Sequence, residues 1–377
     1  MEDTAKDIAN NSAKNPAKIL AEAWCDLPEK CVILHSRNSA QKPWGQFMHQ
    51  DKTKDQSNSN IEAPAYHVPA LLRQSVDALD VRPDGVYVDV TLGGGGHTRE
   101  ILRRLGPEGR LYSFDRDIDA MATAPMEDSR FTMILGNFRY LLCHLQYQGL
   151  AIDAPEGCVD GILADLGVSF HHFDDAERGF TFRDDDAPLD MRMTRTAPVS
   201  AADILNTYEQ DALADILRLY GEVNRPGAVA SAIIRARGVA PLRTSGELMR
   251  AVTPLLNPAR ARKELAQIYQ ALRIVVNDEM SALRHLLIDS LRVLRPGGRL
   301  AVITYHSLED RLVKNFMRAG NFEGKIDKDI YGNVRAPLRP VTSKAIAPDA
   351  EEVARNPRSR SAHLRAASYT PMKINKI

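Results

Sequence analysis

The stretch Val86-Tyr-Val-Asp-Val-Thr-Leu-Gly-Gly-Gly-Gly-His97 decides the fold of this chain. Its first five residues have the composition of a short buried strand, and its four glycines precede a helix expected over 97–105. Glycine tolerates positive φ and lets backbone N–H groups approach a ligand closely. A second strand, expected over 110–115, ends in Asp115, about twenty residues further on, where an acid can accept both hydroxyls of an adenosine ribose. The stretch therefore predicts a site for a nucleoside-containing cofactor.

Outward from this stretch, strands continue to alternate with helices. A second helix is expected over 118–124, and further strands over 131–135, 161–165 and 299–304. A closing strand is expected near 361–369. This alternation, with right-handed crossovers, predicts an α/β fold with a doubly wound, mostly parallel sheet.

A long interruption separates the fourth and fifth strands. Residues 170–262 place Ile, Leu and Val at three- and four-residue intervals, which predicts an all-helical insertion. The α/β domain then consists of residues 65–169 and 263–377. Residues 1–64 are rich in Asn, Ser, Lys and Gln, and too few of them are apolar to offset the entropy of ordering, so this extension is predicted to be disordered.

Composition excludes several classes of protein. Hydrophobic residues make up 44% of the 377 residues, and 49 basic side chains balance 49 acidic ones, so total charge gives no sign of a nucleic-acid partner. No stretch approaches the roughly 18 apolar residues of a membrane span, and no signal peptide is apparent. The four cysteines form no C-x-x-C pair, so neither a zinc site nor a disulfide framework is indicated. A cytoplasmic protein without membrane contact is expected.

The glycine-rich stretch also bears on the identity of the cofactor. It lacks the G-K-[ST] of a phosphate-binding loop and departs from the G-x-G-x-x-G of dinucleotide sites. Asp89, upstream of the glycines, suits an ammonium group better than a pyrophosphate. These features favour S-adenosyl-L-methionine over NAD. A nicotinamide-dependent oxidoreductase and a non-catalytic RNA-binding protein remain as alternatives.

Several longer strings resemble one family. In order, they are His67-Val-Pro-Ala-Leu-Leu72, Asp89 to His97, Ser113-Phe-Asp-Arg-Asp117, Asp165-Leu-Gly-Val-Ser169, Asp174-Asp-Ala-Glu-Arg-Gly-Phe180, Pro188-Leu-Asp-Met-Arg-Met193 and Tyr305-His-Ser-Leu-Glu-Asp-Arg311. From about residue 66 to 370 the chain resembles the RsmH (MraW) family of bacterial ribosomal RNA methyltransferases. The resemblance implies a seven-stranded Rossmann-like methyltransferase sheet. It also implies methylation by S-adenosyl-L-methionine of the exocyclic 4-amino group of a decoding-centre cytidine in 16S ribosomal RNA, as free RNA or in the assembled small subunit.

The resemblance also places residues of the site. It implies cofactor contacts at Gly95, Gly96, His97, Asp115, Phe138, Asp165 and His172. Many relatives have Gln where this chain has His172, which puts that contact in doubt. Asp165 is the candidate for assisting catalysis, since an acceptor for the cytosine amine protons is needed there. The chemistry requires no metal, and the sequence shows no ligand cluster.

Residue types alone leave other interpretations open. His97 can serve the first turn of its helix, Phe138 can belong to the core, and Ser307 with Asp310 can form a variant capping box. Residues 160–192 hold nine acids against three arginines, which are expected to form internal ion pairs. By contrast, eight bases against one acid between 225 and 263, and an Arg-rich tail from 335, predict RNA-binding surfaces on the insertion and the C-terminal segment.

Overall fold

The computed structural model describes residues 32–35, 69–168 and 175–371. Most of the predicted disordered extension, 1–64, and the predicted contact His172 lie outside these residues. Within the extension, the described residues form strand β1 (Val32–His35).

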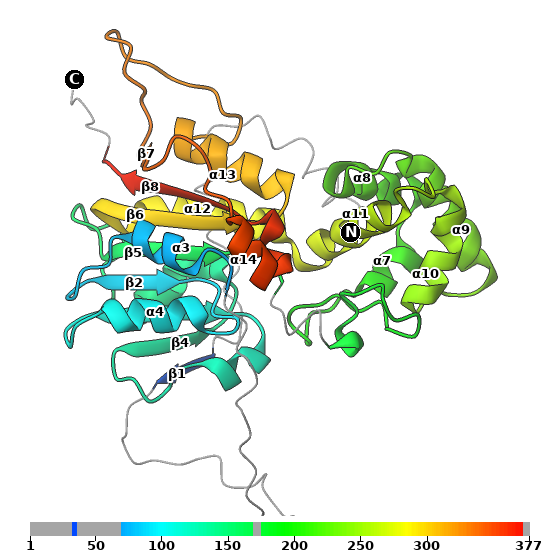
Figure 1. The fold of residues 1–377 in the computed structure, drawn as a ribbon, viewed down its shortest axis with the longest axis horizontal. Coiled ribbons are helices and arrows are strands. Elements are labelled where there is room, and N and C mark those ends of the chain that lie inside the picture. Colours follow the sequence, from blue (N-terminus) through cyan, green and yellow to red (C-terminus); the bar gives the residue numbers. More distant parts are fainter. Residues whose placement is uncertain (1–31, 36–68, 169–174, 372–377) are drawn as a thin grey trace, which may run out of the picture. The chain divides into compact units, whose positions relative to one another are not determined.

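The strands from β2 onward form the sheet that positions the site (Figure 1). They are β2 (Val86–Asp89), β3 (Arg110–Asp115), β4 (Phe131–Leu135), β5 (Val159–Asp165), β6 (Leu294–Thr304), β7 (Leu338–Pro340) and β8 (His363–Tyr369). Their order is β4-β3-β2-β5-β6-β8-β7. The pairs from β4 to β6 are parallel, and β8 is antiparallel to both β6 and β7. The predicted mostly parallel, doubly wound sheet of seven strands is confirmed; β7 was not foreseen.

Helices cover both faces of this sheet, which explains why its central strand β5 is almost entirely buried. β5 is buried at every position from Val159 to Ala164, as expected for a strand covered on both sides. On one face, α3 (Leu72–Leu79) and α4 (Gly96–Arg104) pack through side chains such as Leu79 and Ile101. On the other face, the core is formed with α5 (Leu141–Tyr147), α12 (Glu279–Val293) and α13 (Ser307–Ala319).

The order of strands reverses between β2 and β5. The chain runs outward from β2 through β3 to β4, and then crosses to the other side of β2 to form β5. Ligands of open α/β sheets bind in the crevice at the carboxyl ends of the strands beside such a reversal. Asp89, Asp115 and Asp165 are the last residues of β2, β3 and β5, so all three stand at this edge.

A second group of helices has its own apolar core. It comprises α7 (Ala201–Thr207), α8 (Gln210–Gly221), α9 (Pro226–Val239), α10 (Ser245–Val252) and α11 (Ala261–Asn277). α10 lies within the insertion that was predicted to be helical, and a capping box formed by Thr244 and Glu247 marks its start. Leu265, Ile268 and Leu272 of α11 pack into this core. The helical group therefore extends past residue 262, where the sequence-based boundary was placed.

Two other local features differ from expectation. Residues Ile118–Thr123 form a 3₁₀ helix, η2, in place of the predicted α-helix, and Asp117 caps it by accepting a hydrogen bond from the Asp119 N–H. The C-terminal segment adds the short helices α14 (Ala350–Arg355) and η6 (Pro357–Ser361) before β8. Across the described part of the chain, no helix has the length and apolar character needed to cross a membrane.

Candidate active site

The glycine-rich loop takes a shape that side chains would not allow. Gly95 has φ +73° and precedes the first residue of α4, and a Cβ there would lie 2.9 Å from the Thr123 carbonyl oxygen. A Cβ on Gly96 would lie 2.6 Å from the ring of Pro69. A Cβ on Gly94, by contrast, would meet nothing within 4 Å. Gly95 and Gly96 thus let the loop fold tightly, while the backbone at Gly94 borders open space.

Asp115 fixes the same loop from the end of β3. Its Oδ2 accepts a hydrogen bond from the Gly93 N–H at 2.8 Å, and its Oδ1 accepts one from the Asp117 N–H at 2.9 Å. A carboxylate oxygen can accept more than one hydrogen bond. The carboxylate is therefore oriented by the backbone and can still accept hydroxyl groups of a ligand.

Asp89 has a structural role that its position in the sequence did not predict. It is fully buried, and its Oδ2 accepts a hydrogen bond from Thr98 Oγ1 at 2.8 Å while its Oδ1 accepts one from the Thr91 N–H at 3.1 Å. Burial raises the pKa of Asp89 to about 7, and the hydrogen bond from Thr98 opposes that rise. The carboxyl group braces the start of α4 against β2 and does not line the cavity described below.

Asp165, at the end of β5, carries the most distinctive polar contacts of the site. Tyr305, which follows β6, donates its phenol O–H to Asp165 Oδ1 at 2.8 Å. Nδ1 of His97 lies 3.8 Å from Asp165 Oδ2. Burial raises the pKa of Asp165 to about 7, whereas the hydrogen bond from Tyr305 lowers it. Burial lowers the pKa of His97 to about 4, so this histidine is neutral at pH 7.

These groups border one cavity of about 450 Å³ at the carboxyl edge of the sheet. The sheet edge and its loops contribute Gly94, Gly96, His97, Asp115, Phe138, Asp165 and Tyr305 to its walls. The segment after β5 contributes Phe182 and Arg183, the helical group contributes Arg262, and η6 contributes Arg358. Of the predicted contacts, Gly96, His97, Asp115, Phe138 and Asp165 are brought together here, whereas Gly95 is buried and does not line the cavity. The volume is within the range typical of sites for cofactor-sized ligands.

Phe138 contacts both the hydrophobic core and the cavity, the two positions that the sequence left open for it. It begins the 3₁₀ helix η3 (Phe138–Tyr140), packs against the core beneath the sheet and also lines the cavity. Asn137 caps η3 by accepting a hydrogen bond from the Arg139 N–H. An apolar ring is thereby held on a cavity wall, a surface suited to a flat heterocycle.

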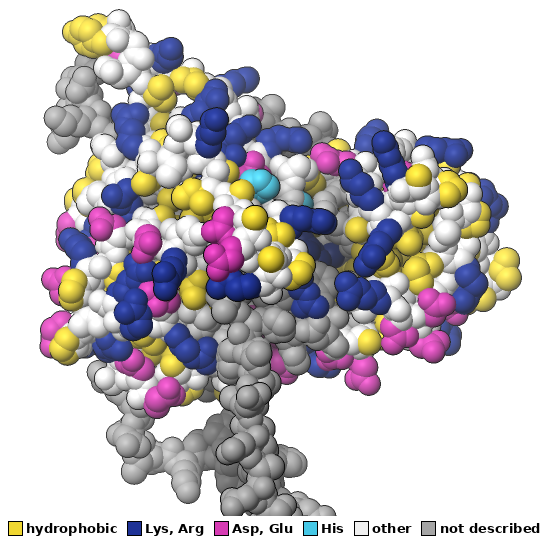
Figure 2. All heavy atoms as spheres, in the orientation of Figure 1, with side chains coloured by type: hydrophobic (Ala, Val, Ile, Leu, Met, Phe, Trp, Pro, Cys, Tyr) yellow, Lys and Arg dark blue, Asp and Glu magenta, His cyan; other side chains and the backbone are white. Residues whose placement is uncertain are grey.

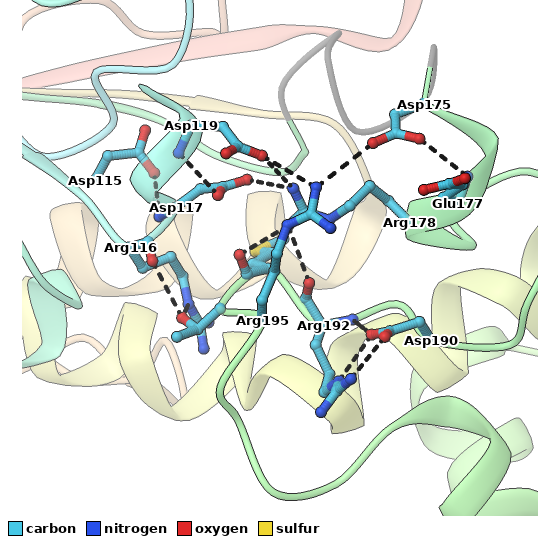
Figure 3. A network of polar contacts seen from close by, with 12 residues as sticks. Asp115, Arg116, Asp117, Asp119, Asp175, Glu177, Arg178, Asp190, Arg192 and Arg195 are labelled. Atoms are coloured by element: carbon cyan, nitrogen blue, oxygen red, sulfur yellow. Dashed lines mark hydrogen bonds and ion pairs between the residues drawn. The ribbon is translucent and has the colours of Figure 1, made fainter. Parts of the chain in front are cut away.

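An ion-pair network ties the segment after β5 to the loop after β3 (Figure 3). Arg178 is 2% exposed, and its Nη1 lies 2.8 Å from Asp117 Oδ2 and 3.1 Å from Asp119 Oδ2. Its Nη2 donates to the Met193 carbonyl oxygen at 2.9 Å. Of the other two arginines of the acidic segment, which were also expected to pair within it, Arg192 lies 2.7 Å from Asp190, whereas Arg183 has no ion pair with any described residue. The acidic segment is thus partly neutralised, although Arg178 pairs with acids outside it.

A buried polar cluster lies beside the cavity. Glu279, His306 and Glu309 bring possible metal-ligand atoms within 4.8 Å of one another. The guanidinium of Arg273 forms two hydrogen bonds with Glu279, at 2.8 and 2.9 Å, and so supplies the positive charge there. His306 is the N-cap of α13, since its Nδ1 accepts from the Glu309 N–H. Helix capping at this motif therefore falls to His306 and not to Ser307.

Comparison with known proteins identifies the family. A model of the MraW methylase family matches residues 64–370. The chain belongs to the MraW methylase family. It is 57% identical over 302 residues to ribosomal RNA small subunit methyltransferase H of Parabacteroides distasonis, covering 80% of this chain and 97% of that protein. The protein of the same name from Christiangramia forsetii is 49% identical over the same shares.

Membership of this family confirms the resemblance seen in the sequence and the methyltransferase class, and it decides against the oxidoreductase alternative. A solved rRNA methylase from Streptococcus thermophilus covers 81% of this chain and 99% of its own, at 12% identity and a TM-score of 0.34.

The residues present fit the cofactor of such an enzyme. Glycine backbone at Gly94 borders open space, so a ligand can approach its N–H and C=O groups. Asp115 is an oriented acceptor for ribose hydroxyls, and Phe138 is an apolar wall for an adenine. Asp165 offers negative charge for a cationic ligand, in keeping with a sulfonium and an ammonium group.

Sequence reasoning missed Tyr305, Arg183 and Arg358 as residues of the cavity. For Tyr305 a signal was available, because it directly follows a strand expected at 299–304, and the carboxyl ends of parallel strands meet at one edge. For Arg183 and Arg358 no local pattern points to the cavity.

Proposed function

We propose that this protein transfers the methyl group of S-adenosyl-L-methionine to the exocyclic 4-amino group of a decoding-centre cytidine in 16S ribosomal RNA. The observation that carries the proposal is one cavity that gathers Gly96, His97, Asp115 and Asp165 in a chain belonging to the MraW methylase family. The 49–57% identity to proteins named ribosomal RNA small subunit methyltransferase H supports the substrate.

In this proposal the strand-ending acids and the glycine loop hold the cofactor. Asp115 accepts the ribose hydroxyls, Phe138 lies against the adenine, and Gly95, Gly96 and His97 shape the loop at the methionine end. The bound cofactor supplies an electrophilic methyl group on a sulfonium sulfur. His172 would complete this set from residues outside the described part of the chain.

Asp165 is the residue proposed to assist the chemistry. The cytosine amine is a weak nucleophile because its lone pair is delocalised into the ring, so an acceptor for its N–H groups favours attack. Asp165 borders the cavity, and its pKa of about 7 lets the carboxylate form accept an amine proton near neutral pH. Tyr305 orients that carboxylate through its 2.8 Å hydrogen bond and leaves the other oxygen toward His97.

The helical group and the C-terminal segment are proposed to bind the RNA. Residues 170–262, together with the α11 side chains that share their core, form the recognition part, and residues 65–169 and 263–377 the methyltransferase part. Lys and Arg side chains are frequent on the face of the helical group shown in Figure 2. The substrate is 16S RNA, free or in the small subunit, and the enzyme acts in the cytoplasm.

Mapping methylated cytidines tests the proposal. Small-subunit RNA from cells with and without the gene is digested and analysed by mass spectrometry, and purified protein is added to subunits from the deletion strain. We expect one decoding-centre cytidine to lose its N4-methyl in the deletion strain and to regain it in vitro with S-adenosyl-L-methionine. Unchanged methylation in the deletion strain would refute the proposed substrate. Binding of the cofactor without any methyl transfer would favour the non-catalytic alternative.

A further inference from the structure

Three arginines from distant parts of the chain line the same cavity and are exposed to solvent. Arg183 lies in the segment after β5, Arg262 in the first turn of α11, and Arg358 in η6. Their positions span 175 residues of sequence, so the fold alone brings them together. Exposed side chains that line a cavity form its rim, and we refer to these three as the arginine rim.

Two members of the arginine rim, Arg183 and Arg262, differ from the partly buried arginines of the cavity. Arg116 donates to the Thr194 hydroxyl and the Asn277 carbonyl oxygen, and Arg273 is paired with Glu279, so both serve the protein itself. Within the described residues, neither Arg183 nor Arg262 has an Asp or Glu side chain within ion-pair distance. Their charge is therefore available to a ligand.

The charge of the arginine rim does not suit the cofactor. S-adenosyl-L-methionine has a cationic sulfonium and no phosphate, and its single carboxylate cannot engage three guanidinium groups. The acids that follow Arg183 (184–186) do not line the cavity, and Asp184 Oδ1 accepts a hydrogen bond from the Asp186 N–H. A polyanion at the cavity mouth is the ligand that three exposed guanidinium groups attract most strongly.

We infer that Arg183, Arg262 and Arg358 bind the backbone phosphates on either side of the cytidine that enters the cavity. The inference rests on the proposed function and names the residues that engage its RNA. A base must leave its stack before an enzyme can reach its exocyclic group, and phosphate contacts beside the cavity hold the strand in that state. Arg262 and Arg358 come from the two parts with basic sequence, the helical group and the C-terminal segment, whereas Arg183 comes from the acidic segment 160–192.

This assignment changes which arginines of the insertion are expected to contact RNA. Arg237 donates to the carbonyl oxygens of Leu205 and Tyr208, at 2.8 and 2.7 Å, and so secures the turn between α7 and α8. Arg235 donates to the Ser231 hydroxyl one turn earlier in α9. Neither lines the cavity. All three arginines lie in the same basic stretch of the sequence, and only the structure shows that Arg262 lines the cavity whereas Arg235 and Arg237 do not.

The test compares the triple variant Arg183→Gln/Arg262→Gln/Arg358→Gln with the control Arg235→Gln, which removes one exposed arginine of the same helical group. Binding of a fluorescein-labelled transcript of the decoding-centre segment is measured from 50 to 300 mM salt. Cofactor binding is measured by calorimetry, and the methylation KM for subunits by tritium transfer. Circular dichroism confirms that each variant is folded.

For the triple variant we expect RNA affinity to fall at least about tenfold and the logarithmic salt slope to decrease by about two, since each lost contact with a single strand removes about 0.7. Cofactor affinity should stay within twofold, and Arg235→Gln should resemble wild type. An unchanged salt slope, or a loss confined to cofactor affinity, would overturn the arginine rim. Absence of RNA methylation by the wild-type protein would instead refute the proposed function, so the two failures are distinguishable.

Discussion

The substitution Tyr305→Phe removes one atom from the candidate active site and tests the role of Asp165. The phenol O–H of Tyr305 donates to Asp165 Oδ1 at 2.8 Å, and this hydrogen bond lowers the pKa of a carboxyl group that burial raises to about 7. Phenylalanine keeps the ring and its packing. The change therefore isolates the hydrogen bond.

The expected effect follows from the strength of that bond. A hydrogen bond to a charged group contributes about 1.5–3 kcal/mol, which corresponds to roughly 1–2 pKa units. Losing it destabilises the carboxylate, so the pKa of Asp165 rises from about 7 to roughly 8–9. If the carboxylate is the active form, kcat at pH 7 should fall about five- to fiftyfold, and at pH 9 it should recover to within about twofold of wild type.

The assay is the initial rate of tritiated methyl transfer to small subunits that lack the modification, from pH 6 to pH 9.5 at saturating cofactor. Tyr147→Phe is the matched control, because Tyr147 is 75% exposed and does not line the cavity. The rising limb of the kcat profile should move to higher pH in Tyr305→Phe and stay in place in the control. A profile reduced equally at every pH, or one that does not move, would refute the role assigned to Asp165 and Tyr305.

Three further outcomes are expected. Asp115→Ala should weaken cofactor binding by about 1.5–3 kcal/mol in calorimetry, since it removes the acceptor for two hydroxyls, and affinity within twofold of wild type would remove Asp115 from the site. In the folded wild-type protein the pKa of Asp89 is raised from 3.8 to about 7, so the contribution of this group to the free energy of unfolding is full at low pH and is lost as the pH rises from about 4 to 7. Asp89→Asn should abolish this fall in stability. Denaturant titrations with equal pH dependence in variant and wild type would contradict that burial cost, about 4 kcal/mol at most. Deleting residues 1–60 should leave methylation nearly intact, because the family match begins at residue 64, and a tenfold loss would show that the extension binds substrate.

Sequence alone predicted most of the sheet because its strands carry a local signature. The mostly apolar runs predicted as strands over 86–90, 110–115 and 161–165 located β2, β3 and β5 to within two residues. The elements that were missed lack such a signature. β7 (Leu338–Pro340) has three residues and contains a proline, so its pairing depends on β8 and on nothing in its own composition.

The residues of the candidate site also fall into two groups, those that could be predicted from the sequence and those that could not. Loop glycines and strand-ending acids could be predicted because the parallel sheet itself brings the ends of β2, β3 and β5 to one edge. Arg183 and Arg358 could not be predicted, because their place depends on how the segment after β5 and η6 pack against that edge. The partners of Arg178 could not be predicted for the same reason. Asp117 and Asp119 lie about sixty residues earlier in the chain, outside the acidic segment 160–192 within which Arg178 was expected to pair.

The charges around the cavity differ in sign between the side of the sheet, where acidic groups lie, and the exposed rim, where arginines lie. On the side of the sheet, Asp165 borders the cavity and Asp89 is buried outside its lining. Burial raises the pKa of both carboxyl groups to about 7, and the charge of Asp89 further raises the pKa of Asp165. A cation entering the cavity relieves that repulsion, whereas an anion would increase it. At the mouth, the arginine rim has the opposite preference. One cavity can therefore hold a cationic cofactor and a polyanionic strand together, each against the charges that attract it, with the reacting groups meeting between them.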